Sequence, residues 1–293
     1  MRPRIIGIPV VLCLLALSAC GPGSGTSSSV DVPAAVTSTP TSTPSPSDGP
    51  LTADYLPGLP ATIRVPAAAG PAPLVVLVPG GGWASADPSG LQPLADVLNR
   101  QGATTVTITY STTSMGAQFP QPVDDVACAL RWSASQASDL GHRPTSVIVV
   151  GHSAGGHLAT LVALSGERFG GGCPWPRVAL DGVVGLAGVY DTTWAIGSLD
   201  RFFGGSTDPE LLAEGSPLAW AQSSEAIPSG LRVLLVHGDA DGVVPLEQTR
   251  LLADALRGSR ADVSVVVMDG QDHDTVYRAD VAGPEIREWM GLP

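Results

Sequence analysis

The sequence predicts an α/β fold in which helices cover both faces of a mostly parallel sheet. Short apolar runs rich in β-branched residues alternate with segments of helical spacing, and these runs have no polar face. Apolar residues make up 44% of the 293 residues, enough to bury a sizeable core. Charged residues make up only 14%, which argues against a largely disordered chain. The formal net charge of −12 argues against a nucleic-acid-binding protein, because such proteins carry an excess of basic residues.

The N-terminus resembles a bacterial lipoprotein signal. Arg2 and Arg4 precede the apolar run 5–17, and small residues lead to Cys20. The resemblance implies that residues 1–19 are removed, that Cys20 is lipidated, and that the exported protein is anchored on the extracytoplasmic face of the cell membrane. An ordinary cleaved signal with an incidental cysteine is the alternative. A retained anchor is disfavoured, because the apolar run is shorter than the roughly 20 residues that span a bilayer.

A tether and one folded domain are expected to follow. Residues 20–54 are rich in Ser, Thr and Pro, and such a segment cannot bury enough apolar surface to offset its ordering entropy. We expect it to be a disordered tether, and residues 55–293 to form the α/β domain. The apolar patterns predict strands over 74–78, 104–110, 146–150, 183–186, 231–236 and 263–267, and helices over 91–100, 123–140, 157–164, 246–256 and 279–290.

The motif Gly151-His152-Ser153-Ala154-Gly155 lies where a strand should turn into a helix. Alone the pattern is weak, and a glycine-rich turn with an exposed serine would produce it too. Its context strengthens it, because an apolar strand precedes it and a helical segment follows. This strand, turn and helix form the nucleophile elbow that presents a serine hydroxyl at the strand end.

A serine nucleophile needs a histidine base that is held by a carboxylate. Asp241 lies in the turn after the strand 231–236, and His273 follows the strand 263–267. Parallel strands present their carboxyl ends at one edge of the sheet, so both can approach Ser153. Asp239 is the rival acid in the same turn, and we favour Asp241.

Four motifs together resemble the esterase–lipase branch of the α/β-hydrolases, including carboxylesterases and feruloyl- or acetyl-esterases. The resemblance rests on the segments 79–83 (PGGGW), 151–157 (GHSAGGH) and 237–245 (HGDADGVVP), and on His273. It implies hydrolysis of carboxylic esters of small to medium acyl groups through an acyl-enzyme, with Ser153 as nucleophile. It implies a small-molecule or carbohydrate ester as substrate. We predict no cofactor and no metal; the sequence does not identify a protein partner.

The resemblance also implies an oxyanion hole made by the backbone N–H groups of Gly81, Gly82 and Ala154. One residue departs from the family pattern: Pro79 stands where the family usually has a histidine that helps to hold the glycine loop. Proline has no N–H and restricts the backbone where the glycine loop begins, so the sequence does not show which residue holds this loop in place.

The other polar residues near these motifs are expected to have structural roles. Asp272 and Asp274 are interpreted as loop acids, and His142 as a surface loop residue. His237 should end its strand and support the acid loop. The remaining two histidines, expected to pack or to form hydrogen bonds, are His152 and His157.

Three questions stay open from the sequence. Cys128 and Cys173 either form a disulfide, as an exported protein allows, or remain separate thiols. The segment 190–230 is either a small lid or a set of helices packed on the sheet. Two other functions compete with ester hydrolysis: an amide or peptide hydrolase of the same fold, and an inactive binding module on the cell surface.

Overall fold

The computed structural model describes residues 49–293, except 195, 197 and 224–226. The predicted signal, the lipidation site Cys20 and nearly all of the predicted tether therefore lie outside the described residues. Within the described part of the chain, none of the helices is both long and apolar enough to cross a membrane.

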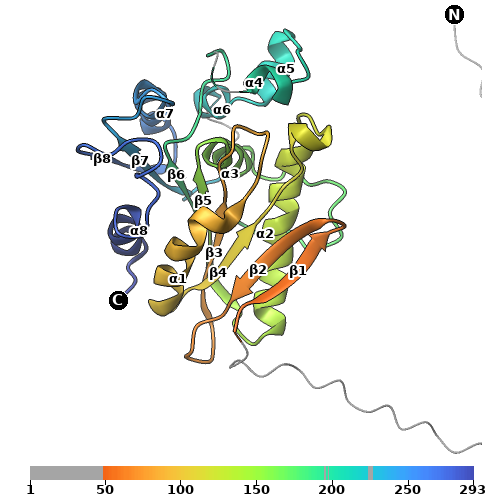
Figure 1. Ribbon diagram of the computed structural model, residues 1–293, viewed down its shortest axis with the longest axis vertical. Helices are drawn as coiled ribbons and strands as arrows, with labels where there is room; N and C mark the ends of the chain where they lie inside the picture. Colours follow the sequence, from red (N-terminus) through yellow and green to blue (C-terminus); the bar gives the residue numbers. More distant parts are fainter. Residues whose placement is uncertain (1–48, 195, 197, 224–226) are drawn as a thin grey trace, which may run out of the picture. The chain divides into compact units, whose positions relative to one another are not determined.

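One eight-stranded sheet organises the domain, in the order β1-β2-β4-β3-β5-β6-β7-β8 (Figure 1). The pairs β1–β2 and β2–β4 are antiparallel, and all other neighbouring pairs are parallel. The mostly parallel sheet predicted from the sequence is thus confirmed. The strands are β1 (Leu51–Leu56), β2 (Leu59–Arg64), β3 (Ala72–Val78), β4 (Thr104–Ile108), β5 (Pro144–His152), β6 (Gly182–Leu186), β7 (Arg232–Gly238) and β8 (Asp262–Met268).

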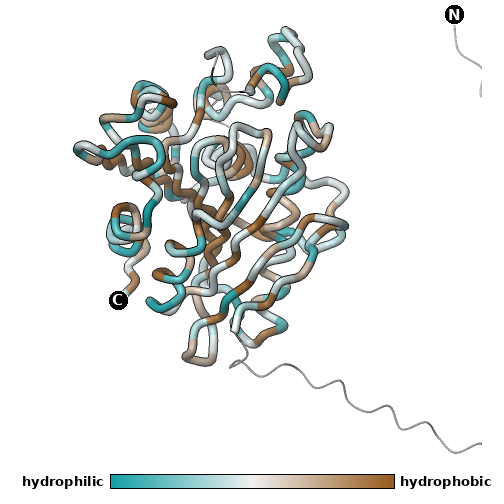
Figure 2. The backbone as a smooth tube through the Cα atoms, in the orientation of Figure 1, coloured by the Kyte–Doolittle hydropathy of each residue, from teal (hydrophilic) through white to brown (hydrophobic). Residues whose placement is uncertain are grey.

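Helices cover both faces of this sheet. The longer ones are α1 (Gln92–Arg100), α2 (Gln121–Asp139), α3 (Ala154–Ser165), α7 (Glu247–Arg257) and α8 (Ala282–Met290). Successive strand residues point to opposite faces. In β3, Val75 and Leu77 join the apolar cluster with α1 and α8, whereas Leu74 and Val76 join the cluster with α2, α3 and α7. The central strands are accordingly hydrophobic along their length (Figure 2).

The hairpin β1–β2 differs from the prediction. β1 begins at Leu51, inside the stretch 20–54 that was expected to be tether, so the folded domain begins earlier than the predicted residue 55. Gly58 makes the turn with φ +76°, and Tyr55 is buried with its hydroxyl donating to Thr109 O. Only one residue of β1 is buried, because β1 is an edge strand. Its sequence therefore lacks the apolar run that identified the central strands.

The insertion between β6 and β7 forms three short helices, α4 (Leu199–Phe202), α5 (Pro209–Glu214) and α6 (Pro217–Gln222). Asp208 and Ser216 each cap a helix that starts with proline, a pattern that fixes where a helix begins. Phe202 and Phe203 are buried, and α6 packs against α3 and α7. These contacts favour the packed alternative over a free lid for α6 and for the end of α4.

Cys128 of α2 and Cys173, which follows α3, are joined in a disulfide, with their Cα atoms 5.3 Å apart. The interpretation of His142 as a surface residue is wrong, because its exposed fraction is 1%. Gly141 ends α2 with φ +84°, and the His142 N–H then donates to Ala137 O. This turn brings the chain back over the end of α2 and buries the imidazole.

Candidate active site

Ser153 lies in a strained turn between β5 and α3. Its φ of +53° is rare for a residue with a side chain, and its N–H donates to Leu186 O of β6. A Cβ on Gly151 would lie 2.1 Å from Gly155 O, and one on Gly155 would lie 2.3 Å from Val78 O. The two motif glycines are therefore required for close backbone approach, and the turn has the geometry of a nucleophile elbow.

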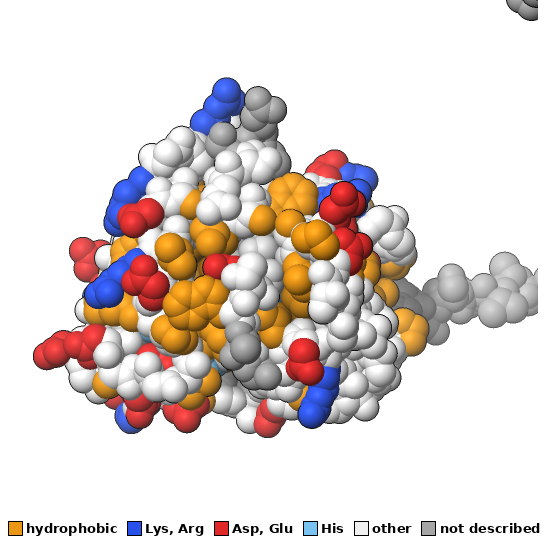
Figure 3. Space-filling view, turned by 90° about the horizontal axis from the view of Figure 1, so that it is seen from above, with side chains coloured by type: hydrophobic (Ala, Val, Ile, Leu, Met, Phe, Trp, Pro, Cys, Tyr) orange, Lys and Arg blue, Asp and Glu red, His pale blue; other side chains and the backbone are white. Residues whose placement is uncertain are grey.

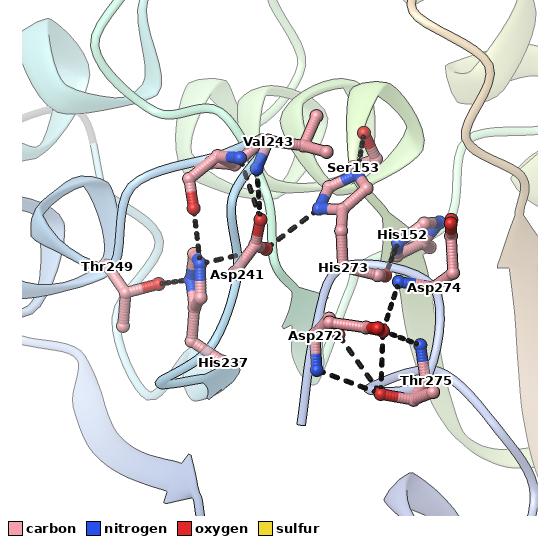
Figure 4. A network of polar contacts seen from close by, with 11 residues as sticks. His152, Ser153, His237, Asp241, Val243, Thr249, Asp272, His273, Asp274 and Thr275 are labelled. Carbon is pink, nitrogen blue, oxygen red and sulfur yellow. Dashed lines mark hydrogen bonds and ion pairs between the residues drawn. The ribbon is translucent and has the colours of Figure 1, made fainter. Parts of the chain in front are cut away.

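The three residues predicted to act together lie in one hydrogen-bonded chain (Figure 4). His273 Nε2 is 2.9 Å from Ser153 Oγ, and His273 Nδ1 is 2.8 Å from Asp241 Oδ2. Because a carboxylate only accepts, Nδ1–H donates to Asp241 and Nε2 is left to accept from the Ser153 hydroxyl. The arrangement can remove the hydroxyl proton as the oxygen attacks an electrophile.

Asp241 is held from several sides. Its Oδ1 accepts the N–H groups of Val243 and Val244, each at 2.8 Å, and its Oδ2 also lies 3.2 Å from His237 Nε2. Burial alone would raise the pKa of Asp241, but the hydrogen bonds from the two histidines and the two amides lower it well below the usual value. The carboxylate therefore stays charged at neutral pH, which favours a protonated His273 during proton transfer.

The other acids near the site accept backbone N–H groups of the loop after β8 instead. Asp239 Oδ1 accepts the N–H of Gly270 at 2.7 Å. Asp272 Oδ1 accepts the Thr275 hydroxyl and the N–H groups of Thr275 and Asp274, and these hydrogen bonds, the hydroxyl's first, lower the pKa of Asp272 (Figure 4). Both carboxylates therefore bond to the loop that carries His273, and Asp272 is a loop acid, as the sequence interpretation expected.

Two further histidines support the site. His152 Nε2–H donates to the main-chain carbonyl of His273 at 2.9 Å, and the two rings lie 4.8 Å apart. Burial, followed by the nearby His273, lowers the pKa of His152 to about 3. His237 bridges Thr249 Oγ1 at 2.7 Å and Val244 O at 2.9 Å, so it supports the acid loop.

A pocket of about 330 Å³ opens beside Ser153. The predicted oxyanion residues Gly81 and Gly82 line it, and Ala154 is the first residue of α3. Gly81 has φ +131°, and a Cβ there would lie 2.4 Å from Ser85 O, so only glycine fits. Sequence reasoning missed the apolar walls of this pocket, which are Trp83, Val189, Ile196, Val243 and Val244.

One wall residue, Val243, lies two residues after Asp241 in the same turn. It is 59% exposed, so it presents an apolar side chain at the open side of the pocket. Seen from above, hydrophobic side chains gather around the centre of the face of the molecule that Figure 3 shows. Among the described residues, no three His, Cys, Asp or Glu side chains are grouped as metal ligands would be.

Comparison with known families identifies the chain. The sequence profile of the BD-FAE family matches residues 62–256. The chain belongs to the BD-FAE family. This BD-FAE chain is 30% identical to esterase LipC and 32% identical to esterase LipQ, both from Mycobacterium tuberculosis. The alignments cover 69% of this chain and 53% of LipC, and 75% of this chain and 55% of LipQ. The chain thus spans about half the length of the curated relatives it matches.

Solved structures show the same fold. Esterase 2 of Thermogutta terrifontis, phosphoramylated by tabun, matches with a TM-score of 0.68 and 24% identity, over 83% of this chain and 96% of that chain. The acetyl ester-xyloside bifunctional hydrolase of Caldicellulosiruptor lactoaceticus matches with a TM-score of 0.67 and 23% identity, over 80% and 88%. The BD-FAE chain therefore has the α/β-hydrolase fold that the motifs suggested.

Proposed function

We propose that this protein is a serine hydrolase that cleaves carboxylic esters of small to medium acyl groups. The observation that carries the proposal is the unbroken chain from Ser153 Oγ through His273 to Asp241, with distances of 2.9 and 2.8 Å. The esterase names of the family relatives support the same reaction class. A complete chain of this kind argues against an inactive binding module.

The reaction follows from the roles of the three side chains. Ser153 Oγ attacks the acyl carbon while His273 Nε2 takes its proton, and Asp241 stabilises the imidazolium that results. His273 then gives the proton to the departing alcohol, which leaves an acyl-enzyme. A water molecule, deprotonated by His273, attacks the acyl carbon, and Ser153 leaves with the proton as the acid is released.

The developing oxyanion needs fixed donors. We assign this role to the N–H groups of Gly81, Gly82 and Ala154, which belong to the pocket-lining loop and to the first turn of α3. A donor fixed in place before the reaction is worth about 3–4 kcal/mol in the transition state. The N-terminal end of α3 adds a favourable dipole at the same position.

The pocket limits the acyl group. Its volume of about 330 Å³ and its walls of valine, isoleucine and tryptophan side chains suit short and medium chains better than long ones. The alcohol part can be a carbohydrate, since one structural neighbour is named a carbohydrate esterase. Neither feature separates simple esters from sugar esters, so the substrate panel has to contain both.

Hydrolysis of a graded series of p-nitrophenyl esters, an acetylated polysaccharide and a peptide amide tests the proposal. We expect turnover of the short esters and little turnover of the amide. A fluorophosphonate should label the wild-type protein once, at Ser153, and Ser153→Ala should abolish both labelling and turnover. Labelling that persists unchanged in that variant contradicts the assignment of the nucleophile, and preferential turnover of the amide contradicts the substrate class.

We also propose that the protein is exported and anchored through a lipid on Cys20. The signal-like N-terminus supports this, and so does the disulfide between Cys128 and Cys173, because disulfides persist in oxidising compartments. Cys20→Ser should move the protein from the membrane fraction to the soluble or unprocessed pool. An unchanged distribution would mean that something else holds the protein at the membrane.

A further inference from the structure

Trp83 ends the glycine loop in an unusual backbone conformation. Its φ is +59°, in the left-handed region that bulky side chains rarely adopt, and the residue is 1% exposed. A conformation of this kind persists only where the surroundings enforce it. Trp83 also lines the pocket beside Ser153, next to Gly81 and Gly82. Whatever holds Trp83 therefore also determines where these two amides point.

The side chain of Trp83 is held by His157 of α3. Trp83 Nε1–H donates to His157 Nδ1 at 3.2 Å, and His157 Nε2 lies 2.8 Å from Gly215 O. The indole nitrogen can only donate and the carbonyl can only accept, so both contacts require the same neutral tautomer, with its proton on Nε2. Burial lowers the pKa of His157 to about 4, which keeps the ring neutral near pH 7.

Packing and main-chain contacts also hold Trp83 and the glycine loop. The Trp83 ring meets the His157 ring edge-on at 5.4 Å between centroids and lies 5.5 Å from Phe202 of the insertion. Trp83 O accepts the N–H of Thr113 at 2.8 Å. At the other end of the loop, Pro79 offers only its carbonyl, which accepts the Tyr110 hydroxyl at 3.1 Å. The hydrogen bond from Trp83 to His157 thus holds the end of the glycine loop that lies next to Gly81 and Gly82.

We propose that His157 is a positioning residue for the oxyanion hole, which acts through Trp83. By accepting the indole N–H, it sets the backbone of the glycine loop, and by donating to Gly215 it ties that loop to the insertion. The inference rests on the proposed ester hydrolysis, since it assigns the support of that site's oxyanion donors. His157 thus supplies a side-chain hydrogen bond that holds the glycine loop, which the side chain of Pro79 cannot supply.

Two substitutions separate the two bonds of His157. His157→Asn places an amide oxygen near the position of Nδ1, so it keeps the acceptor for Trp83 and loses the donor to Gly215. His157→Gln places an amide nitrogen near the position of Nε2, so it keeps the donor and loses the acceptor. Each variant is polar, is equally buried and loses one hydrogen bond, so each is the other's control for general destabilisation.

Hydrolysis of p-nitrophenyl acetate and the rate of fluorophosphonate labelling at Ser153 are the readouts. For His157→Gln we expect kcat and the labelling rate to fall roughly 10- to 100-fold, with KM changed by less than about threefold. For His157→Asn we expect both rates to stay within about threefold of wild type. Equal losses in the two variants, or a larger loss in His157→Asn, would overturn the proposal.

Trp83→Phe decides the matter if either histidine variant fails to fold. It removes only the indole N–H and part of the ring, and we expect a fall in kcat with little change in KM. An unchanged kcat and labelling rate would overturn the proposal. Failure of the proposed function is a separate outcome. If the wild-type protein hydrolyses no ester, the reaction class is refuted, and the rates of labelling at Ser153 still test the positioning role of His157.

Discussion

The loops at the strand ends and the insertion between β6 and β7 are held in different ways. The loops that carry Ser153, Asp241 and His273 each follow directly from a hydrogen-bonded strand of the sheet. The insertion, residues 190–230, contains three helices of at most six residues. Isolated helices of that length are not stable in water, so tertiary contacts must hold them.

Besides its buried phenylalanines and the Phe119 N–H, which donates to Phe202 O at 2.8 Å, single side chains anchor the insertion. Gln248 Oε1 accepts the N–H groups of Tyr190 and Asp191 at 2.7 Å each, and His157 reaches Gly215. The sheet thus positions Ser153, Asp241 and His273 through many repeated backbone bonds, while the insertion, which contributes Ile196 to the pocket wall, is held by fewer contacts. Changes at the strand ends should therefore affect catalysis, and changes at the anchors should affect stability and pocket shape.

The largest effect is expected from the acid at a strand end. Asp241→Asn keeps the shape but removes the charge and disturbs the tautomer of His273, so kcat should fall by roughly 10³–10⁴ with little change in KM. Steady-state kinetics on a short p-nitrophenyl ester measures this. Asp239→Asn is the matched control, because it removes the same charge from the same turn, and its activity should stay within about tenfold. If Asp239→Asn loses more activity than Asp241→Asn, the assignment of Asp241 as the catalytic acid is wrong.

The disulfide should matter for stability and little for catalysis. It closes a separation of 45 residues between α2 and the segment after α3. Chain entropy predicts a loss of about 4 kcal/mol in the free energy of unfolding for the double substitution Cys128→Ala and Cys173→Ala. Urea unfolding and kcat measure the two effects. A reductant should destabilise the wild type and leave the variant unchanged. A loss of activity beyond about tenfold in the folded variant would mean that the disulfide matters for catalysis as well as for stability.

Gln248 tests the anchoring of the insertion directly. Gln248→Leu fills similar space but leaves the N–H groups of Tyr190 and Asp191 without their acceptor. One buried and one half-buried unpaired donor should lower the free energy of unfolding, as measured with urea, by about 2–4 kcal/mol. Gln222→Leu, on the exposed surface of α6, is the control and should change it by less than about 0.5 kcal/mol. Equal stability of Gln248→Leu and wild type would mean that the insertion has other anchors.

The smallest expected effect is a pH dependence of stability. Burial lowers the folded-state pKa values of His152 and His157 to about 3 and 4, below their ordinary value of 6.5. Between these values the unfolded chain binds more protons, so stability falls as the pH drops below about 6.5. From pH 7 to pH 6 the loss should be about 1–2 kcal/mol in urea unfolding. His157→Asn should show a shallower slope, and equal slopes would contradict a buried neutral His157.

One carboxyl opposes this trend. Burial raises the pKa of Asp125, which accepts the Ser111 N–H, so its protonation favours the folded state in the acid range. The pH dependence is therefore expected to be clearest between pH 7 and pH 6, above the range in which aspartates titrate.

Much of the fold and the site could be predicted from the sequence, because the signals were local. The buried strands appear as apolar runs, and the proposed nucleophile lies in a pattern of five consecutive residues, Gly151–Gly155. The sequence pattern did not predict the structure where only one face of a strand is buried, or where a turn reverses the chain. β1 has one buried residue and no apolar run, and His142 is buried by a glycine turn that composition does not reveal.

The sequence by itself determined the strand and helix pattern, the turn chemistry at Ser153 and the order of the three proposed catalytic residues. Only the tertiary structure decided which carboxylate reaches His273, whether Cys128 pairs with Cys173, and which nitrogen of each supporting histidine carries the proton. The physical reason is distance along the chain. A hydrogen-bond role depends on the partner that the fold brings within about 3 Å, and Trp83 and His157 become partners only when the sheet places β3 beside β5.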